Sequence, residues 1–409
     1  MENNKKTVCA IICEYNPMHT GHKFLIEEAK KKTNSTYMLG LMSGNFSQRS
    51  EPCILDKYTR SEIAIKNGMD AVINLPTAFC VNNAEIFALA SIKILNNIKV
   101  DYLAFGMETI NETALFCLAN FLLNEPKKFK KELKLELQKG LSYNIALIYA
   151  IKKNINYFDK NIQKDILDIL TLPNNILGLE YVKALIKTKS KIKPIFIKRV
   201  NNYNNNNIIE NFASASHIRE KIFENNIQNV KDFLPENSIK YFENISLNLE
   251  LYNNLILYKI KNSNQKYLKQ IYSINEGLDN KLINESKINF DYETFYQKLK
   301  TKRYKQNKIN AILLNSLLDI DKKTIKKLYT IKNNICVKML AINKSKSDIF
   351  KQINTKSVII RKNDMHKINN KFNKKLVLIE NTANIVYNLI SNSKLIESDF
   401  YNKMRIVNI

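Results

Sequence analysis

The chain has 409 residues, 45% of them hydrophobic and 25% charged, which is the composition of a globular protein of two or three domains. It carries 64 Lys and Arg residues against 38 Asp and Glu residues, a formal net charge of +26. Such an excess favours a nucleic-acid partner, the alternative being a merely solvated basic surface. The first apolar run, 8–13, is too short for a signal sequence or a membrane span, so the expected compartment is the cytosol, without a membrane partner.

The first 125 residues alternate short apolar runs with helical patterns. Strands are expected over 7–13, 36–42, 70–75 and 101–105, and helices over 21–32, 56–67 and 83–95. This alternation predicts βαβ units and therefore a Rossmann-like parallel sheet. In such sheets ligands bind beyond the carboxyl ends of the strands. The polar segments 14–17 and 43–45 and residue Gly106 are expected there.

The remainder of the chain reads as mainly helical. Residues 112–189 have a helical pattern, within which Pro173 opens a helix, and 194–199 is one more expected strand. An Asn-rich loop follows at 201–207. We predict a catalytic domain over residues 1–225 and a basic, mainly helical second domain over residues 226–409.

The motif His19-Thr20-Gly21-His22 directly follows the first strand and begins a helix. A helix N-terminus offers free N–H groups to phosphate, and Gly21 permits close approach of a nucleotide. Two imidazoles one turn apart can both donate hydrogen bonds to phosphate oxygens. A metal-ligand pair is the alternative, but no carboxylate–histidine set accompanies the two residues, so no metal site is expected. The motif predicts displacement at the α-phosphate of ATP, with His19 and His22 as catalytic residues.

A second element, Ser214-Ala215-Ser216-His217-Ile218-Arg219, precedes another helical pattern. A Ser near a helix start can cap the helix and also bind phosphate, and Arg219 lies where it can reach a polyphosphate. The alternative interpretation is an ordinary capped helix with a solvated Arg. We include Ser216 and Arg219 among the candidate ATP-binding residues.

Together these motifs resemble the HIGH and ISSTxR signatures of the nucleotidylyltransferase superfamily. Longer segments resemble one member, the bacterial tRNA(Met) cytidine acetate ligase family: CEYNPMHTGH (13–22), LMSGNFSQRSEP (41–52), LDKYTRSEIAIKNGMDAVINLP (55–76), FGME (105–108) and PNNILGLEYVKAL (173–185). The match is dense over the first 110 residues and collinear beyond them. The sequence departs from the family pattern at Ser50, where Gly is expected. Residues 302–318 match the family pattern only loosely.

The resemblance implies an activity that the spacing of residues does not. Members of the family adenylate acetate with ATP and pass the acetyl group to the wobble cytidine of elongator tRNA(Met), forming N4-acetylcytidine, AMP and diphosphate. It also implies that the second domain binds tRNA. The implied ATP contacts are Ile12, Cys13, Glu14, Tyr15, Asn16, Pro17, Met18, His19, Thr20, Gly21, His22, Lys23, Phe24, Leu25, Gly106, either Asn174 or Asn175, and Arg199.

The resulting hypothesis places ATP over the ends of the first and fourth strands. Mg²⁺ is expected to accompany ATP and to be held by the phosphates, since no carboxylate cage is evident. The Ser43–Phe46 turn is a candidate for part of the acyl pocket, or else a loop without a ligand role. Two alternative functions remain open. One is an adenylyl- or cytidylyltransferase acting on a phosphorylated cofactor precursor, and the other is a non-catalytic RNA-binding protein.

Overall fold

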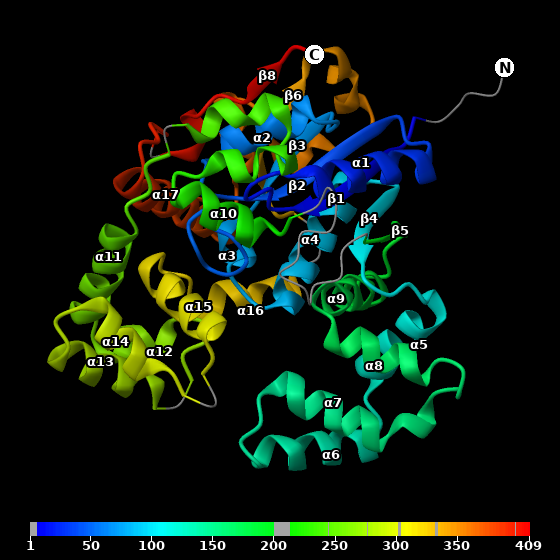
Figure 1. Ribbon diagram of the computed structural model, residues 1–409, viewed down its shortest axis with the longest axis vertical. Coiled ribbons are helices and arrows are strands. Elements are labelled where there is room, and N and C mark those ends of the chain that lie inside the picture. The colour runs from blue at the N-terminus through cyan, green and yellow to red at the C-terminus, as the bar shows by residue number, and fades with distance from the viewer. Residues whose placement is uncertain are drawn as a thin grey trace.

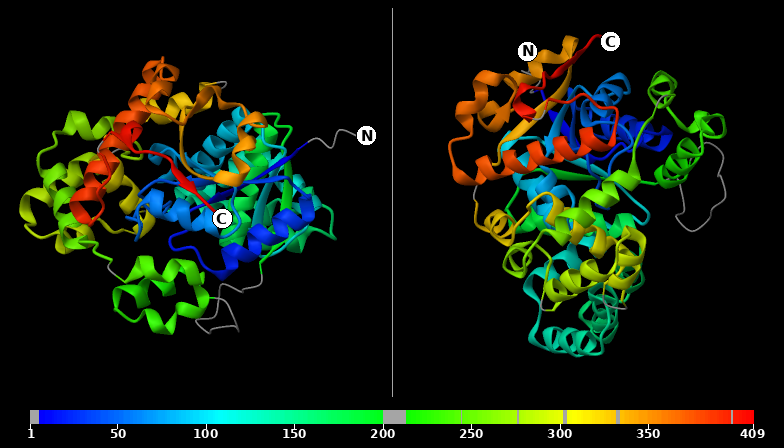
Figure 2. Two further views of the ribbon diagram at one scale, coloured as in Figure 1. Left: turned by 90° about the horizontal axis from the view of Figure 1, so that it is seen from above. Right: turned by 90° about the vertical axis from the view of Figure 1, so that its left-hand side faces the viewer.

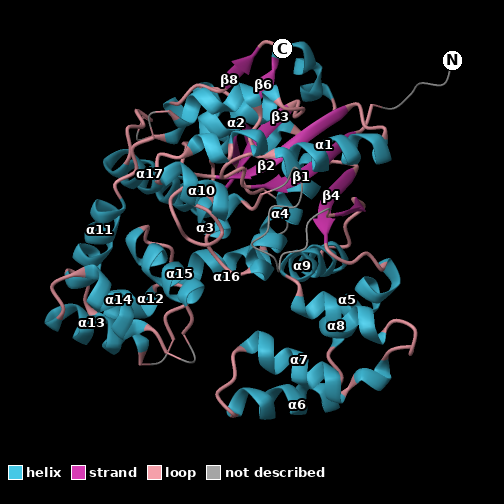
Figure 3. Cartoon of the chain, viewed as in Figure 1, coloured by secondary structure: helices cyan, strands magenta, loops and turns pink. Residues whose placement is uncertain are grey.

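A computed structural model describes residues 6–199, 213–243, 245–275, 277–301, 304–331, 334–396 and 398–409. The Asn-rich loop expected at 201–207 lies outside these residues. The core is an eight-stranded sheet with the strand order β5-β4-β1-β2-β3-β6-β7, in which β8 also pairs with β6 (Figures 1 and 3). The strands are β1 (Val8–Cys13), β2 (Tyr37–Ser43), β3 (Ala71–Leu75), β4 (Tyr102–Met107), β5 (Lys193–Lys198), β6 (Val337–Asn343), β7 (Val358–Ile359) and β8 (Arg405–Val407).

The five strands expected in the first 200 residues are all present and all parallel. β1 pairs with β2 on one side and with β4 on the other. The chain therefore builds outward through β2 and β3 in one direction, and through β4 and β5 in the other. A crevice forms at the carboxyl ends of the strands where this direction reverses. The switch between β1 and β4 thus places a ligand site beside the segment that follows β1, which confirms the Rossmann-like class.

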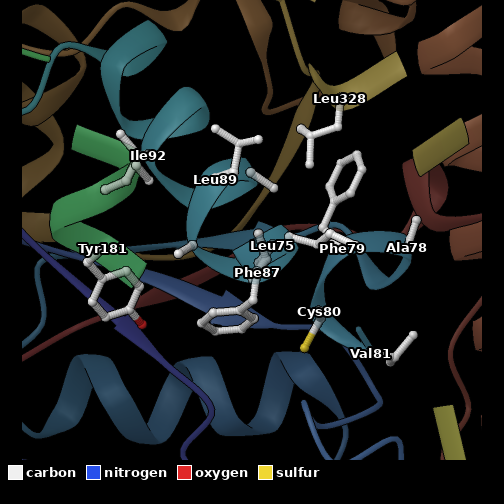
Figure 4. Close-up of a cluster of buried hydrophobic side chains, with 14 of the residues drawn as sticks. Leu75, Ala78, Phe79, Cys80, Val81, Phe87, Leu89, Ile92, Tyr181 and Leu328 are labelled. Atoms are coloured by element: carbon white, nitrogen blue, oxygen red, sulfur yellow. The ribbon is translucent and has the colours of Figure 1, made fainter. Parts of the chain in front are cut away.

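Helices cover both faces of the sheet. α1 (Thr20–Thr33) and α2 (Lys57–Lys66) pack on one face, and α4 (Ala84–Ile98) and α9 (Pro173–Lys187) lie on the other. Because helices cover both faces, the strands carry apolar side chains on both sides. Successive residues of β1 accordingly belong to two different apolar clusters, one on each face of the sheet. Figure 4 shows part of the larger cluster. Its side chains come from β3, from the short helix α3 (Thr77–Cys80), and from α4 and α9. They include Leu75, Phe79, Phe87, Leu89, Ile92 and Tyr181.

Two helical groups extend below the sheet in the view of Figure 1. One is inserted between β4 and α9 and contains α5 (Glu112–Asn124), α6 (Lys127–Gln138), α7 (Tyr143–Lys153) and α8 (Gln163–Thr171). After α10 (Ala215–Phe223), the other contains α11 (Leu249–Lys261), α12 (Gln265–Gln270), α13 (Leu278–Ile288), α14 (Tyr292–Leu299), α15 (Gln306–Leu317) and α16 (Lys322–Thr330). None of the helices in the described ranges combines the length and the apolar character needed to cross a lipid bilayer.

The last part of the chain returns to the sheet, which the sequence did not predict. β6 pairs antiparallel with β3, and β7 and β8 pair parallel with β6 (Figure 2). The parallel sheet thus contains one antiparallel pair, and residues after 336 are not purely helical. The run of β6 is short and apolar within a Lys- and Asn-rich region, where strand and buried helix have the same pattern. The following helix, α17 (Lys371–Ile390), packs against α3.

Candidate active site

The turn between β1 and α1 holds the two histidines in a fixed geometry. His19 is the N-cap of α1, and its Nδ1 accepts a hydrogen bond from the backbone N–H of Gly21 at 3.1 Å. In return, His22 Nδ1 accepts from the backbone N–H of His19 at 3.2 Å. This is a capping box built from two imidazoles. Because both Nδ1 atoms accept, each neutral ring carries its proton on Nε2.

Both imidazoles are neutral at physiological pH. Burial, with a contribution from the Arg199 guanidinium, lowers the pKa of His19 to about 3. Burial also lowers the pKa of His22 well below its usual value, helped by His19 and Arg199. The two rings stack with their centroids 3.8 Å apart. The pair therefore offers two adjacent Nε2–H donors whose charge does not change near pH 7, which suits stabilisation of a developing phosphoryl charge.

Arg199 lies over Gly106 at the end of β4. A Cβ atom on Gly106 would come within 3.1 Å of Arg199 Cγ, so a larger residue would displace the arginine. Arg199 Nη1 donates to Asn174 Oδ1 over 3.5 Å, whereas its buried Nε has no hydrogen-bond partner among the residues that the structure describes. A buried donor without an acceptor is costly unless a ligand supplies one. The two residues, distant in sequence, are thus brought together as expected for a nucleotide site.

The two adjacent asparagines have different roles. Asn175 is fully buried, and its Oδ1 accepts from the backbone N–H groups of Glu108 at 2.9 Å and Thr109 at 3.2 Å. It therefore shapes the loop after β4. Asn174 is half-buried, donates to Glu108 Oε1 at 2.5 Å and reaches Arg199. Both side chains adjoin the site, but Asn175 Nδ2 is the one without a partner in the described ranges.

The second motif also reaches the β1–α1 turn. Ser214 caps α10, accepting from the backbone N–H of His217 at 3.2 Å. Arg219 Nη1 donates to the carbonyl of Asn16 at 2.7 Å, and its Nη2 donates to Ser216 Oγ at 3.3 Å. Arg219 and Ser216 therefore join the histidine turn, as expected. Arg49, which the sequence did not single out, also donates to Ser216 Oγ at 3.3 Å.

Other residues of segment 12–25 face the core rather than the crevice. Cys13 and Met18 belong to the apolar cluster under α1, and the partly buried Phe24 and Leu25 pack against it. Ile12 packs on the opposite cluster, and Lys23 is exposed on α1. The Tyr15 ring meets the His22 ring edge-on, with centroids 5.1 Å apart, which helps to hold the imidazole in place.

The Ser43–Phe46 turn, a candidate for the acyl pocket, is buried and bonded internally. Arg60 donates to the carbonyls of Ser43 and Gly44, and also to that of Glu14 in the neighbouring turn. Asn45 Oδ1 accepts from the backbone N–H of Lys57 at 2.9 Å. The turn lies beside the site, but these polar groups are already hydrogen-bonded within the protein. The expectation that it presents its polar groups to a small acid is therefore not supported.

Behind this turn lies a group of buried charges that sequence reasoning missed. Lys57 Nζ is 2.7 Å from Asp399 Oδ1 and 3.3 Å from Glu380 Oε2, and the lysine side chain is fully buried. Asn384 Nδ2 donates to Asp399 Oδ1 at 3.1 Å. We call Lys57, Glu380, Asn384 and Asp399 the Lys57 network. The sequence shows only a Lys near the start of an expected helix, and the burial of that helix is seen in the structure alone.

Within the described ranges, no group of three or more His, Cys, Asp or Glu residues is arranged to hold a metal ion. The crevice presents imidazole, guanidinium and amide donors, which suit an anionic ligand, while the Glu14 and Glu108 carboxylates accept hydrogen bonds from protein N–H groups. The fit is to the phosphates of a nucleotide rather than to a protein-bound cation.

Comparison with known proteins agrees with this geometry. Residues 6–400 match the family HIGH Nucleotidyl Transferase. A tRNA(Met) cytidine acetate ligase of Clostridium botulinum (strain Langeland) is 35% identical, with 98% of each chain covered. A protein of the same name from Caldanaerobacter subterraneus subsp. tengcongensis is 40% identical over 77% of this chain and 79% of its own length. The crystal structure of Thermotoga maritima TmcAL bound with alpha-thio ATP superposes with a TM-score of 0.87 at 26% identity, covering 98% of this chain and all of the other. The chain belongs to the HIGH nucleotidyl transferase family and, within it, to the tRNA(Met) cytidine acetate ligases.

Proposed function

We propose that this protein uses ATP to convert acetate to acetyl-adenylate and transfers the acetyl group to the wobble cytidine of elongator tRNA(Met). The products are N4-acetylcytidine, AMP and diphosphate. The observation that carries the proposal is the pair of neutral Nε2–H donors at the N-terminus of α1. The relatives that match over nearly the whole chain, named for acetate ligation to tRNA(Met), supply the acceptor and the acid.

In this proposal ATP lies across the ends of β1 and β4, with its phosphates at the N-terminus of α1. The acetate carboxylate, already ionised at pH 7, attacks the α-phosphorus without a general base. The bond from the α-phosphorus to the bridging oxygen breaks, and diphosphate leaves with the electron pair. His19 and His22 donate to the charge that develops, while Arg199 and Arg219 bind the polyphosphate.

In the second step the cytidine amine attacks the acetyl carbonyl and AMP departs. We assign the ATP chemistry to residues 1–225 and tRNA contact mainly to residues 226–409. The net charge of +26 supports attraction of an RNA. Mg²⁺ is expected to arrive with ATP, because the phosphates provide oxygen ligands and no group of three or more His, Cys, Asp or Glu among the described residues is arranged to hold a metal ion.

The test is ATP–pyrophosphate exchange with purified protein, with and without acetate. Acetate-dependent exchange is expected, followed by transfer of labelled acetate to tRNA(Met). A tRNA(Met) transcript with uridine at the wobble position is the matched control and should accept no label. Exchange that requires a phosphomonoester in place of acetate would favour a cofactor nucleotidyltransferase. tRNA binding without any ATP binding would favour a non-catalytic RNA-binding protein.

A further inference from the structure

Arg49 is an exposed arginine at the margin of the candidate active site. Its Nη1 donates to Ser216 Oγ at 3.3 Å, and Arg219 Nη2 donates to the same oxygen at 3.3 Å. Two guanidinium groups therefore share one hydroxyl, which lies 167 positions from Arg49 in the sequence. Arg219 is in turn anchored to the carbonyl of Asn16, three residues before His19. Arg49 is thus held next to the phosphate-binding turn.

The backbone that carries Arg49 is fixed, although its side chain is exposed. Phe46 and Pro52 form an antiparallel bridge at the base of the loop. The backbone N–H of Gln48 donates to Glu14 Oε1 at 2.5 Å, which ties the loop to the end of β1. Ser50 adopts a left-handed conformation with φ 61°, and its hydroxyl donates to the carbonyl of Val81 at 3.0 Å. This conformation explains why Gly is expected at position 50, and the hydroxyl bond offsets part of its strain.

The charges around this loop are unbalanced. Arg49, Arg60 and Arg219 all act on the carboxylate of Glu14, whose pKa burial raises and these three arginines lower. The Glu14 carboxylate is shared among three guanidinium groups, and its Oε1 is engaged by the Gln48 N–H, while Glu51 is a second carboxylate of the same loop. Like charges held together on a fixed backbone repel one another unless an anion lies between them. A multiply charged anion is the ligand that this arrangement fits.

We propose that Arg49 is a second polyphosphate-binding arginine, which acts with Arg219 and Ser216 to hold the β- and γ-phosphates of ATP and the diphosphate that leaves. This inference rests on the proposed use of ATP. The anchor of Arg219 on Asn16 favours the nucleotide over an RNA phosphate, because it places the arginine pair beside the histidine turn. Phosphate groups bind guanidinium forks bidentately, so two arginines can engage adjacent phosphates.

The test compares the binding of ATP, tripolyphosphate and AMP to wild-type protein and to Arg49→Gln by calorimetry. Loss of one charge-assisted contact should weaken ATP and tripolyphosphate roughly tenfold or more. AMP lacks the β- and γ-phosphates, so its affinity should change less than about twofold. Arg49→Lys should fall between, since it keeps the charge and loses the fork. Arg361→Gln, which alters an exposed arginine just after β7 on the far side of β3, is the matched control and should change nothing.

Three results would overturn the inference. The first is an unchanged ATP affinity in Arg49→Gln. The second is an equal loss of affinity for ATP and AMP, which would indicate a merely structural role. The third is a defect confined to tRNA binding, which would assign Arg49 to RNA. None of these depends on acetate. Wild-type protein that binds ATP but shows no acetate-dependent exchange would refute the proposed function and leave the arginine pair as a polyphosphate site.

Discussion

Two polar regions lie at the same edge of the sheet and differ in what their polar atoms bind. At the end of β1, His19 and His22 use Nδ1 to accept backbone hydrogen bonds, which leaves each Nε2–H to donate to a ligand. The buried Arg199 Nε likewise has no partner within the described part of the chain. At the ends of β2 and β3, the Lys57 network pairs its charges within the protein. The first region keeps donors for a ligand, and the second holds the chain together.

The difference shows that a polar segment after a strand is not by itself a binding site. The Glu14–Pro17 and Ser43–Asn45 segments are both polar, and both follow strands of a doubly wound sheet. The second is bonded through Asn45 to Asn384 at 3.1 Å, so a distant helix occupies its donors. The assignment of function depends on the partners of these groups, which only the fold determines. Three changes test whether the two regions are separate in this way.

The largest effect is expected from Lys57→Met. Removing the ammonium leaves the Glu380 and Asp399 carboxylates buried without a compensating charge, and breaking such a pair costs about 3–5 kcal/mol of unfolding free energy. Denaturant unfolding monitored by circular dichroism measures the loss. The triple variant Lys57→Met, Glu380→Gln, Asp399→Asn should recover much of it, because no buried charge then remains. A loss below about 1 kcal/mol in the single variant contradicts a structural role for the network.

His22→Ala should affect chemistry much more than stability. Loss of a donor that acts in the transition state should lower acetate-dependent exchange about a hundredfold. Loss of the hydrogen bond to His19 should cost only about 1 kcal/mol of folding stability. His366→Ala, at an exposed histidine, is the matched control. Exchange within a few-fold of wild type would refute the assignment of His22 and weaken the contrast with the Lys57 network.

The smallest effect concerns pH. Unfolded histidine has a pKa near 6.5, whereas that of folded His19 is lowered to about 3, so the unfolded state binds protons first as pH falls. Stability from this group is complete above pH 6.5 and declines below it, by about 1 kcal/mol between pH 6.5 and 5.5. His19→Asn keeps an N-cap but cannot titrate, so its unfolding free energy should decline less over that window. Parallel pH profiles for the two proteins would show that His19 is not held neutral by the fold.

Much of the sheet and of the nucleotide site could be predicted from sequence, because the signals are local. The first four strands alternate with helices in a regular pattern, and the histidine motif directly follows one of them. Arg219 could be proposed for the site through its own motif, and Arg199 through the resemblance to a known family. Each of these residues carries the relevant chemistry within a few positions of a recognisable element.

The parts that were missed depend on contacts between distant segments. Lys57 and Glu380 are 323 positions apart, so nothing near either residue indicates that they pair. Arg49 is exposed, and only its hydrogen bond to the distant Ser216 indicates a role. The sequence predicts a helical region at β6, because an apolar run of this length is typical of both a strand and a buried helix. Its partner, β3, belongs to the opposite end of the chain.

The place of β6 also bears on how the chain is made. During synthesis β3 leaves the ribosome long before β6, so its outer edge stays unpaired while more than half of the protein is translated. An open edge rich in apolar residues is a site where nascent chains aggregate or bind chaperones. The nucleotide-binding half is therefore expected to be poorly soluble as an isolated fragment. A nonsense mutation anywhere before the codons of β6 should therefore deplete the cell of the protein rather than yield a partly active enzyme.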